Sequence, residues 1–158
     1  MKDESTPESR TPNGRRLRAG RFSEPGRAYL VTMVCRNREP RLATLARGRC
    51  VVQVLREMET DASTLCYVVM PDHVHWLLEL NSDIGLSRVV QKFKSRSTRA
   101  LRQRCGETEG VWQRGFHDRA IRRHEDIRAV ARYVVANPLR AGLVRRLKDY
   151  PLWDAAWL

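Results

Sequence analysis

The chain has 158 residues, of which 30 are Lys or Arg and 18 are Asp or Glu, so its formal charge is +12. Apolar runs stay short of the roughly 18 residues that a membrane span needs, and residues 1–10 lack the apolar stretch of a signal peptide, so we expect a cytoplasmic protein. The charge favours a polyanionic partner, namely DNA, RNA or an acidic membrane surface, and does not choose among the three.

The first 27 residues are rich in Ser, Thr, Pro, Gly and Arg and contain almost no large apolar side chain. We therefore predict a disordered basic tail over residues 1–27 and one folded domain over residues 28–158. The tail is either a plain leader or an arm that condenses on phosphates when nucleic acid is present.

Hydrophobic periodicity divides the domain into alternating strands and helices. The predicted strands cover residues 28–35, 65–70, 73–80 and 111–122, and the predicted helices cover residues 50–62, 86–105 and 125–137. Residues 139–158 are expected to be irregular or briefly helical. This order predicts an α+β fold, a ferredoxin-like antiparallel sheet with helices packed on both faces.

The third predicted strand, HVHWLLEL, carries two histidines. Alternate residues of a strand share a face, so His73 and His75 lie side by side, opposite the core face formed by Val74, Trp76, Leu78 and Leu80. Two adjacent imidazoles can reach one metal ion or one phosphate. The alternative is a pair of surface or hydrogen-bonded histidines without such a role.

The long helix over residues 86–105 is expected to be basic on one side. A buried stripe runs through Val90, Phe93, Ser97, Leu101 and Cys105, and cations lie opposite it. Trp112 shares a strand face with Arg114 and is a possible stacking partner for an unpaired base. The alternatives are a solvated helix face and a core tryptophan. The predicted DNA-binding residues are Arg88, Lys92, Arg96, Arg99, Arg102 and Arg114.

The last predicted helix places Tyr133 outside its buried stripe of Ile127, Val130, Ala131 and Val134. Asn137 lies four residues later, which makes it a neighbour of Tyr133 on the helix surface. Taken alone, the pattern also fits a half-buried tyrosine beside a helix-terminating Asn-Pro.

Three ordered motifs, PDHVHWLLEL, VWQRGFHDRAIR and ARYVVANPLRAGLV, together with the opening YLVTMVCRNREP, resemble the REP-associated tyrosine transposases of the HUH superfamily. The resemblance runs from about residue 29 to residue 144. It implies that His73 and His75 bind a divalent cation, Mg²⁺ or Mn²⁺, with Asn137 as a third ligand, and that Tyr133 is the nucleophile. Where such proteins often carry a second histidine, this chain has Arg119.

The resemblance further implies a metal-dependent enzyme, a monomer or a homodimer, that nicks and rejoins single-stranded or hairpin DNA. A tyrosine nucleophile would store the broken bond as a 5′-phosphotyrosine and leave a free 3′-OH, so the step can be reversed onto another DNA end. Two other hypotheses stay open: a ferredoxin-like nucleic-acid-binding protein without catalysis, and a phosphodiesterase that uses water as the nucleophile.

Overall fold

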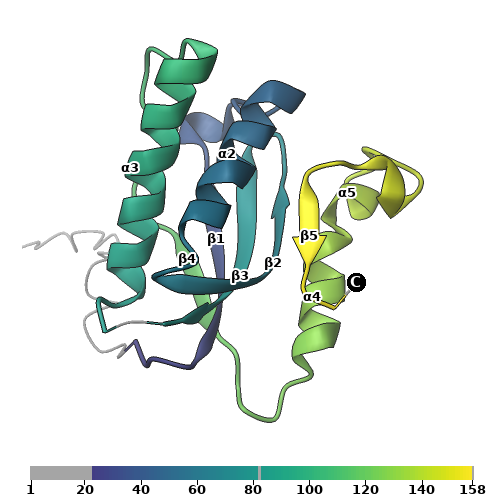
Figure 1. Ribbon diagram of the computed structural model, residues 1–158. Coiled ribbons are helices and arrows are strands. Elements are labelled where there is room, and N and C mark those ends of the chain that lie inside the picture. Colours follow the sequence, from purple (N-terminus) through teal and green to yellow (C-terminus); the bar gives the residue numbers. More distant parts are fainter. Residues whose placement is uncertain (1–22, 82, 158) are drawn as a thin grey trace, which may run out of the picture.

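The computed structural model describes residues 23–81 and 83–157 (Figure 1). Most of the predicted tail therefore lies outside the described residues. Residues 23–27, which were assigned to that tail, contact the domain: the Leu86 N–H donates to Ser23 Oγ at 2.9 Å and the Gly26 N–H donates to the Leu80 carbonyl at 2.8 Å. The part of the domain that is described thus begins at Ser23, earlier than the predicted boundary.

Within the described residues, five strands form one antiparallel sheet in the order β4-β1-β3-β2-β5. The strands are β1 (Ala28–Val34), β2 (Ala62–Val69), β3 (His73–Leu80), β4 (His117–Ala120) and β5 (Trp153–Ala155). The predicted hairpin of residues 65–70 and 73–80 is thus β2 and β3, and β3 is the central strand. The predicted α+β fold with an antiparallel sheet is confirmed.

Helices cover both faces of the sheet, as predicted. On one face lie α2 (Leu45–Glu57) and α3 (Leu86–Cys105), and on the other lie α4 (Ile127–Val135) and the short α5 (Asn137–Arg140) (Figure 1). Trp76 of β3 packs against Phe93 of α3 on the first face. Leu77 belongs to the second core, with Ala131 and Val134 of α4. None of the described helices is long and apolar enough to cross a bilayer.

Several element boundaries differ from the predicted ones, and the structure gives a reason for three of these differences. Helix α2 begins at Leu45, before residue 50, because the Thr44 side chain accepts a hydrogen bond from the Arg47 N–H and caps it. Only His117–Ala120 of the predicted strand 111–122 is regular, and Trp112 makes an isolated bridge with Cys35. The C-terminal segment, expected to be irregular, supplies the edge strand β5 beside β2.

The end of α4 determines where Asn137 lies. The Asp126 side chain caps the helix by accepting hydrogen bonds from the N–H groups of Arg128 and Ala129. Pro138 lacks an N–H, which disfavours it inside a helix but is tolerated in a first turn. Accordingly α4 ends at Val135, and the chain starts a new helical turn, α5, at Asn137.

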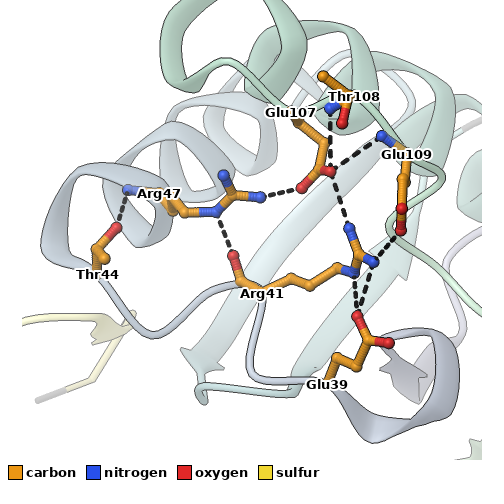
Figure 2. A network of polar contacts seen from close by, with 7 residues as sticks. All are labelled: Glu39, Arg41, Thr44, Arg47, Glu107, Thr108 and Glu109. Carbon is orange, nitrogen blue, oxygen red and sulfur yellow. Dashed lines mark hydrogen bonds and ion pairs between the residues drawn. The ribbon is translucent and has the colours of Figure 1, made fainter.

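An ion-pair network ties the segment before α2 to the segment after α3 (Figure 2). Glu107, whose side chain is only 6% exposed, pairs with Arg41 at 2.8 Å and with Arg47. Arg41 also pairs with Glu39 at 2.7 Å and Glu109 at 2.6 Å. Backbone hydrogen bonds link the segment before α2 to the residues just before β3. The Leu42 N–H donates to the Pro71 carbonyl, and the Cys35 N–H donates to the Asp72 carbonyl.

Replacing Glu107 by glutamine is expected to lower the free energy of unfolding by about 1–3 kcal/mol at pH 7, since it removes the shared carboxylate from two largely buried guanidinium groups. Glu109→Gln, at a 64% exposed side chain, is the matched control, with an expected loss below about 1 kcal/mol. Urea unfolding of the two variants measures the difference, and equal losses would contradict this role for Glu107.

The Glu107 contribution is also expected to depend on pH. Burial alone would raise the pKa of Glu107, but the hydrogen bonds from the Glu109 N–H and from Arg47 outweigh burial and lower the pKa from its usual 4.5. A carboxylate with a lowered pKa stabilises the folded state above pH 4.5, and this stability is lost as the pH falls through the folded-state pKa. As the pH is lowered from 7 to 3, the urea midpoint of Glu107→Gln should therefore fall less steeply than that of the wild type.

Candidate functional site

Both histidines of β3 lie on the sheet face that α4 covers. Strand alternation places His73 and His75 with Leu77, which packs against α4, and opposite the buried Val74 and Trp76. Their ring centroids are 4.8 Å apart, with an interplanar angle of 82°. The predicted side-by-side placement of the two imidazoles is therefore observed.

Each imidazole is held at its Nδ1 atom. Thr32 lies opposite His75 on β1, with Oγ1 at 2.8 Å from His75 Nδ1. Asp72 Oδ1 is 2.6 Å from His73 Nδ1. A carboxylate or hydroxyl on one ring nitrogen fixes the tautomer and the ring orientation, and leaves the other nitrogen for a metal. The arrangement thus leaves the Nε2 atom of each ring for a ligand.

The two side chains of the Asp72–His73 contact affect each other electrostatically. Burial alone would raise the pKa of Asp72, but the hydrogen bond and the electrostatic interaction with His73, together with the charge of Arg38, outweigh burial and lower the pKa. Asp72 is therefore an anion that can accept a hydrogen bond from the Nδ1–H of His73. Carboxylates hold metal-binding histidines in this way in carboxylate–histidine–metal arrangements.

The second histidine is neutral at physiological pH. Burial is the main cause that lowers the pKa of His75 to about 4, and the electrostatic influence of His73 and Arg140 acts in the same direction. A metal ligand must be the neutral imidazole, and His75 meets this requirement over the whole neutral range.

Tyr133 extends from α4 into solvent. Its neighbours Ala131 and Val134 are buried against the sheet, whereas Tyr133 itself is 66% exposed. The guanidinium carbon of Arg140 lies 3.8 Å from the centroid of its ring. A large aromatic side chain held outside a well-packed helix stripe fits a role in binding or chemistry better than a role in the core.

Asn137 stands at the first residue of α5, and its side chain is oriented by α4. The Nδ2 group donates to the Val134 carbonyl at 2.7 Å, so Oδ1 is the atom left for a ligand. The described residues hold no group of three His, Cys, Asp or Glu side chains suited to a metal ion. Two imidazoles and an amide oxygen are nevertheless an acceptable donor set for a divalent cation.

The predicted DNA-binding residues fall into three groups. Lys92 pairs with Asp61 at 2.6 Å, and Arg96 lies 4.0 Å from the Met58 sulfur, so both face the α2 side of α3. Arg88 is exposed near the start of α3. A groove of 780 Å³ between α3 and residues 110–116 is lined by three further arginines, Arg99, Arg102 and Arg114. Ion pairs of these three with other described residues are absent.

Of the two roles that the sequence left open for Trp112, the structure supports a core residue and not a stacking partner for DNA. The Trp112 side chain is 9% exposed, packs against Phe93, and donates its indole N–H to the buried Ser97 Oγ at 2.9 Å. Lys94 holds the same segment by donating to the Gln113 carbonyl at 2.9 Å and to that of Gly115. Trp112 is therefore a core residue at the floor of the groove, the alternative that the sequence left open.

Sequence reasoning missed three residues that surround the candidate site, namely Thr32, Asp72 and Arg140. Thr32 is a polar residue in the apolar strand YLVTMV, and Asp72 directly precedes the first histidine, so both carried a local signal. The position of Arg140 depends on the turn from α4 into α5, and the hydrophobic periodicity of the sequence does not predict this turn.

Comparisons with known proteins agree with this geometry. Residues 27–137 match the family model described as IS200-like transposase, a segment that contains β3 and α4 and ends at Asn137. A REP-associated tyrosine transposase of Escherichia coli (strain K12) is 29% identical over 136 residues, 83% of this chain and 78% of that protein. A Haemophilus influenzae protein given the same name provisionally is 30% identical over 98 residues, 56% of each chain.

Solved structures include a similar fold. A structure described as a REP-associated tyrosine transposase bound to a REP hairpin matches with a TM-score of 0.70 and 26% identity, over 84% of this chain and 79% of that chain. A Deinococcus radiodurans structure, described with reservation as a transposase, matches with a TM-score of 0.55 at 21% identity, over 75% of this chain and 95% of that one.

Proposed function

The chain belongs to the IS200-like transposase family and is thus a DNA transposase; on that premise we propose that it cleaves and rejoins single-stranded or hairpin DNA through Tyr133. The relative bound to a REP hairpin supports this class of substrate. The observation that carries the proposal is the position of α4, which holds the exposed Tyr133 on the same sheet face as the two oriented imidazoles.

His73, His75 and Asn137 would hold a divalent cation, Mg²⁺ or Mn²⁺, through Nε2 of each imidazole and Oδ1 of the amide. For His75 this requires the tautomer in which Nδ1–H donates to Thr32 Oγ1. When bound, the cation would neutralise the charge that develops on the phosphate oxygens during attack. Asp72 and Thr32 fix the orientation of the two rings through their Nδ1 atoms, so they are positioning residues.

Tyr133 would act as the nucleophile. Its phenolic oxygen attacks the phosphorus of the scissile phosphodiester while the phenolic proton is lost, the bond to the 3′-oxygen of the preceding nucleotide breaks, and that oxygen takes up a proton. The products are a 5′-phosphotyrosine and a free 3′-OH. Because the phosphodiester energy is kept in the covalent intermediate, a second 3′-OH can reverse the step on another DNA end.

An end-labelled hairpin with a single-stranded flank tests the proposal. Incubation with the protein and Mn²⁺ or Mg²⁺ is expected to give a covalent adduct that survives denaturant, and chelation should prevent it. Cleavage with two free ends and no adduct would indicate water as the nucleophile. Binding that survives chelation without any cleavage would indicate a nucleic-acid-binding protein without this activity.

We propose that DNA phosphates bind in the groove lined by Arg99, Arg102 and Arg114. Three of the six predicted DNA-binding residues are therefore proposed to contact DNA there. Replacing these three arginines by glutamine is expected to weaken hairpin binding and to reduce the slope of log K against log salt by about 2, because each phosphate contact on a single strand releases about 0.7 counterions. Fluorescence anisotropy over a salt series measures both quantities.

The matched control replaces three exposed cations elsewhere, Arg49, Arg145 and Lys148, which lie outside the groove. Its total charge change is the same. If the groove binds phosphates, the control variant loses less affinity and less slope than the groove variant. Equal losses in the two variants would mean that the overall charge of the protein, and not this groove, attracts the DNA.

A further inference from the structure

The contact between Arg140 and Tyr133 is the observation from which this inference starts. The guanidinium carbon lies 3.8 Å from the centroid of the tyrosine ring, within the range of a cation–π interaction. Arg140 comes from α5, after the break at Ala136, so the two side chains are brought together by the turn between the helices. Both side chains are exposed, and an approaching DNA strand has access to them.

Arg140 also belongs to α5 (Asn137–Arg140), the short helix that begins with Asn137, the proposed amide ligand. It thus contacts the proposed nucleophile and comes from the element that carries a proposed metal ligand. Among the residues that the structure describes, no carboxylate pairs with Arg140. A permanently charged guanidinium without an anionic partner, in contact with the proposed nucleophile, is suited to an anionic ligand.

We infer that Arg140 binds a non-bridging oxygen of the scissile phosphate while it holds the Tyr133 ring in place for attack. The inference rests on the proposed function and adds a substrate-binding residue to it. The phenolic oxygen lies at the rim of the ring, so a guanidinium stacked on the ring face is next to any phosphorus that this oxygen attacks. The planar fork of arginine donors then fits the phosphate oxygens.

The competing explanation is a surface contact without catalytic meaning. An exposed cation–π pair is weak, and an arginine can cover a tyrosine for solubility or packing alone. The two explanations differ in one respect. A phosphate contact depends on the charge of the scissile phosphate, whereas a packing contact does not.

The test combines Arg140→Gln with hairpins that carry a methylphosphonate at the scissile position, as two separated diastereomers. Methylphosphonate replaces one charged non-bridging oxygen by a neutral methyl group. On the natural phosphate, Arg140→Gln is expected to slow adduct formation at saturating DNA by about 100-fold, the effect of losing one donor to a developing anion. On one of the two diastereomers the variant and the wild type should react at nearly equal rates. Arg140→Lys, which keeps the charge, should recover part of the loss.

Arg145→Gln, an exposed cation on the same segment that is outside the site, is the control and should react at the wild-type rate. The inference is overturned if Arg140→Gln reacts as fast as the wild type on the natural phosphate. It is also overturned if the loss is the same for the phosphate and for both methylphosphonates. Failure of the wild type itself to form an adduct would instead overturn the proposed function, so the two failures are distinguishable.

Discussion

Tyr133→Phe is expected to abolish formation of the covalent protein–DNA adduct, with a loss on the order of 10³-fold or more, since removing a nucleophile leaves only the binding contribution to the rate. The substitution removes one oxygen from a side chain that is 66% exposed, so the fold and its stability should be unchanged. Denaturing gel electrophoresis of labelled hairpin after reaction with Mn²⁺ measures the adduct.

The other tyrosines provide the control for this variant. Tyr67 is 5% exposed on β2 and belongs to the core on the α2 and α3 face of the sheet, so Tyr67→Phe should form the adduct at the wild-type rate. Hairpin affinity of Tyr133→Phe, measured with chelator present, should be close to that of the wild type. If Tyr133→Phe formed the adduct as fast as the wild type, another residue would be the nucleophile.

His75→Ala is expected to slow metal-dependent cleavage at least about 100-fold. Substitution of an outer partner of a metal-bound histidine already lowers metal affinity or activity about 10–100-fold, and loss of a direct ligand should cost more. The substitution also leaves Thr32 Oγ1 without its partner on β3. Single-turnover cleavage over a Mn²⁺ titration measures the effect, and calorimetric titration with Mn²⁺ in the absence of DNA should show weakened metal binding.

His124 gives the matched control for that variant. It is exposed on the connection between β4 and α4, so His124→Ala should keep the wild-type Mn²⁺ dependence. A His75→Ala protein that is folded, binds Mn²⁺ as tightly as the wild type and cleaves at the same rate would contradict the assignment of His75 as a metal ligand.

Strand alternation and helix periodicity in the sequence were sufficient where the structure depends on residues close together in the chain. The alternation in HVHWLLEL correctly placed His73 and His75 on one face and Trp76 on the other, because strand geometry depends only on the residue period. The stripe of α3 was likewise sufficient to predict its span from residue 86 to residue 105. The predicted position of Tyr133 outside its helix stripe also agrees with its exposure.

Features that depend on distant partners were not predictable from these patterns. β5 has only three residues and forms by pairing with β2, some 85 residues earlier in the chain, so it has little period of its own. Trp112 was placed by strand alternation, whereas the observed backbone is mostly irregular there and Ser97 of α3 binds the indole. The ion pairs of Glu107 with Arg41 and Arg47 join the segment after α3 to the start of α2, and no local motif predicts this contact.

The candidate site depends both on local sequence patterns and on contacts between distant segments. The histidine pair and Tyr133 came from local spacing and from the family resemblance, but the partners that orient the histidines required the register of β1 against β3, which pairs Thr32 with His75. The position of Arg140 required the helical break between α4 and α5 at Ala136. The sequence therefore suggested the proposed metal ligands and nucleophile, whereas Thr32, Asp72 and Arg140 were recognised only from the structure.

The central claim is that Tyr133 becomes covalently joined to the 5′-phosphate of cleaved DNA, and peptide mapping of the adduct tests it most directly. The protein is reacted with a hairpin in Mn²⁺, digested with protease and nuclease, and analysed by tandem mass spectrometry. We expect a nucleotide phosphate on Tyr133 and a free 3′-OH on the other DNA fragment. A nucleotide on any other residue, or attachment through a 3′-phosphate, would contradict it.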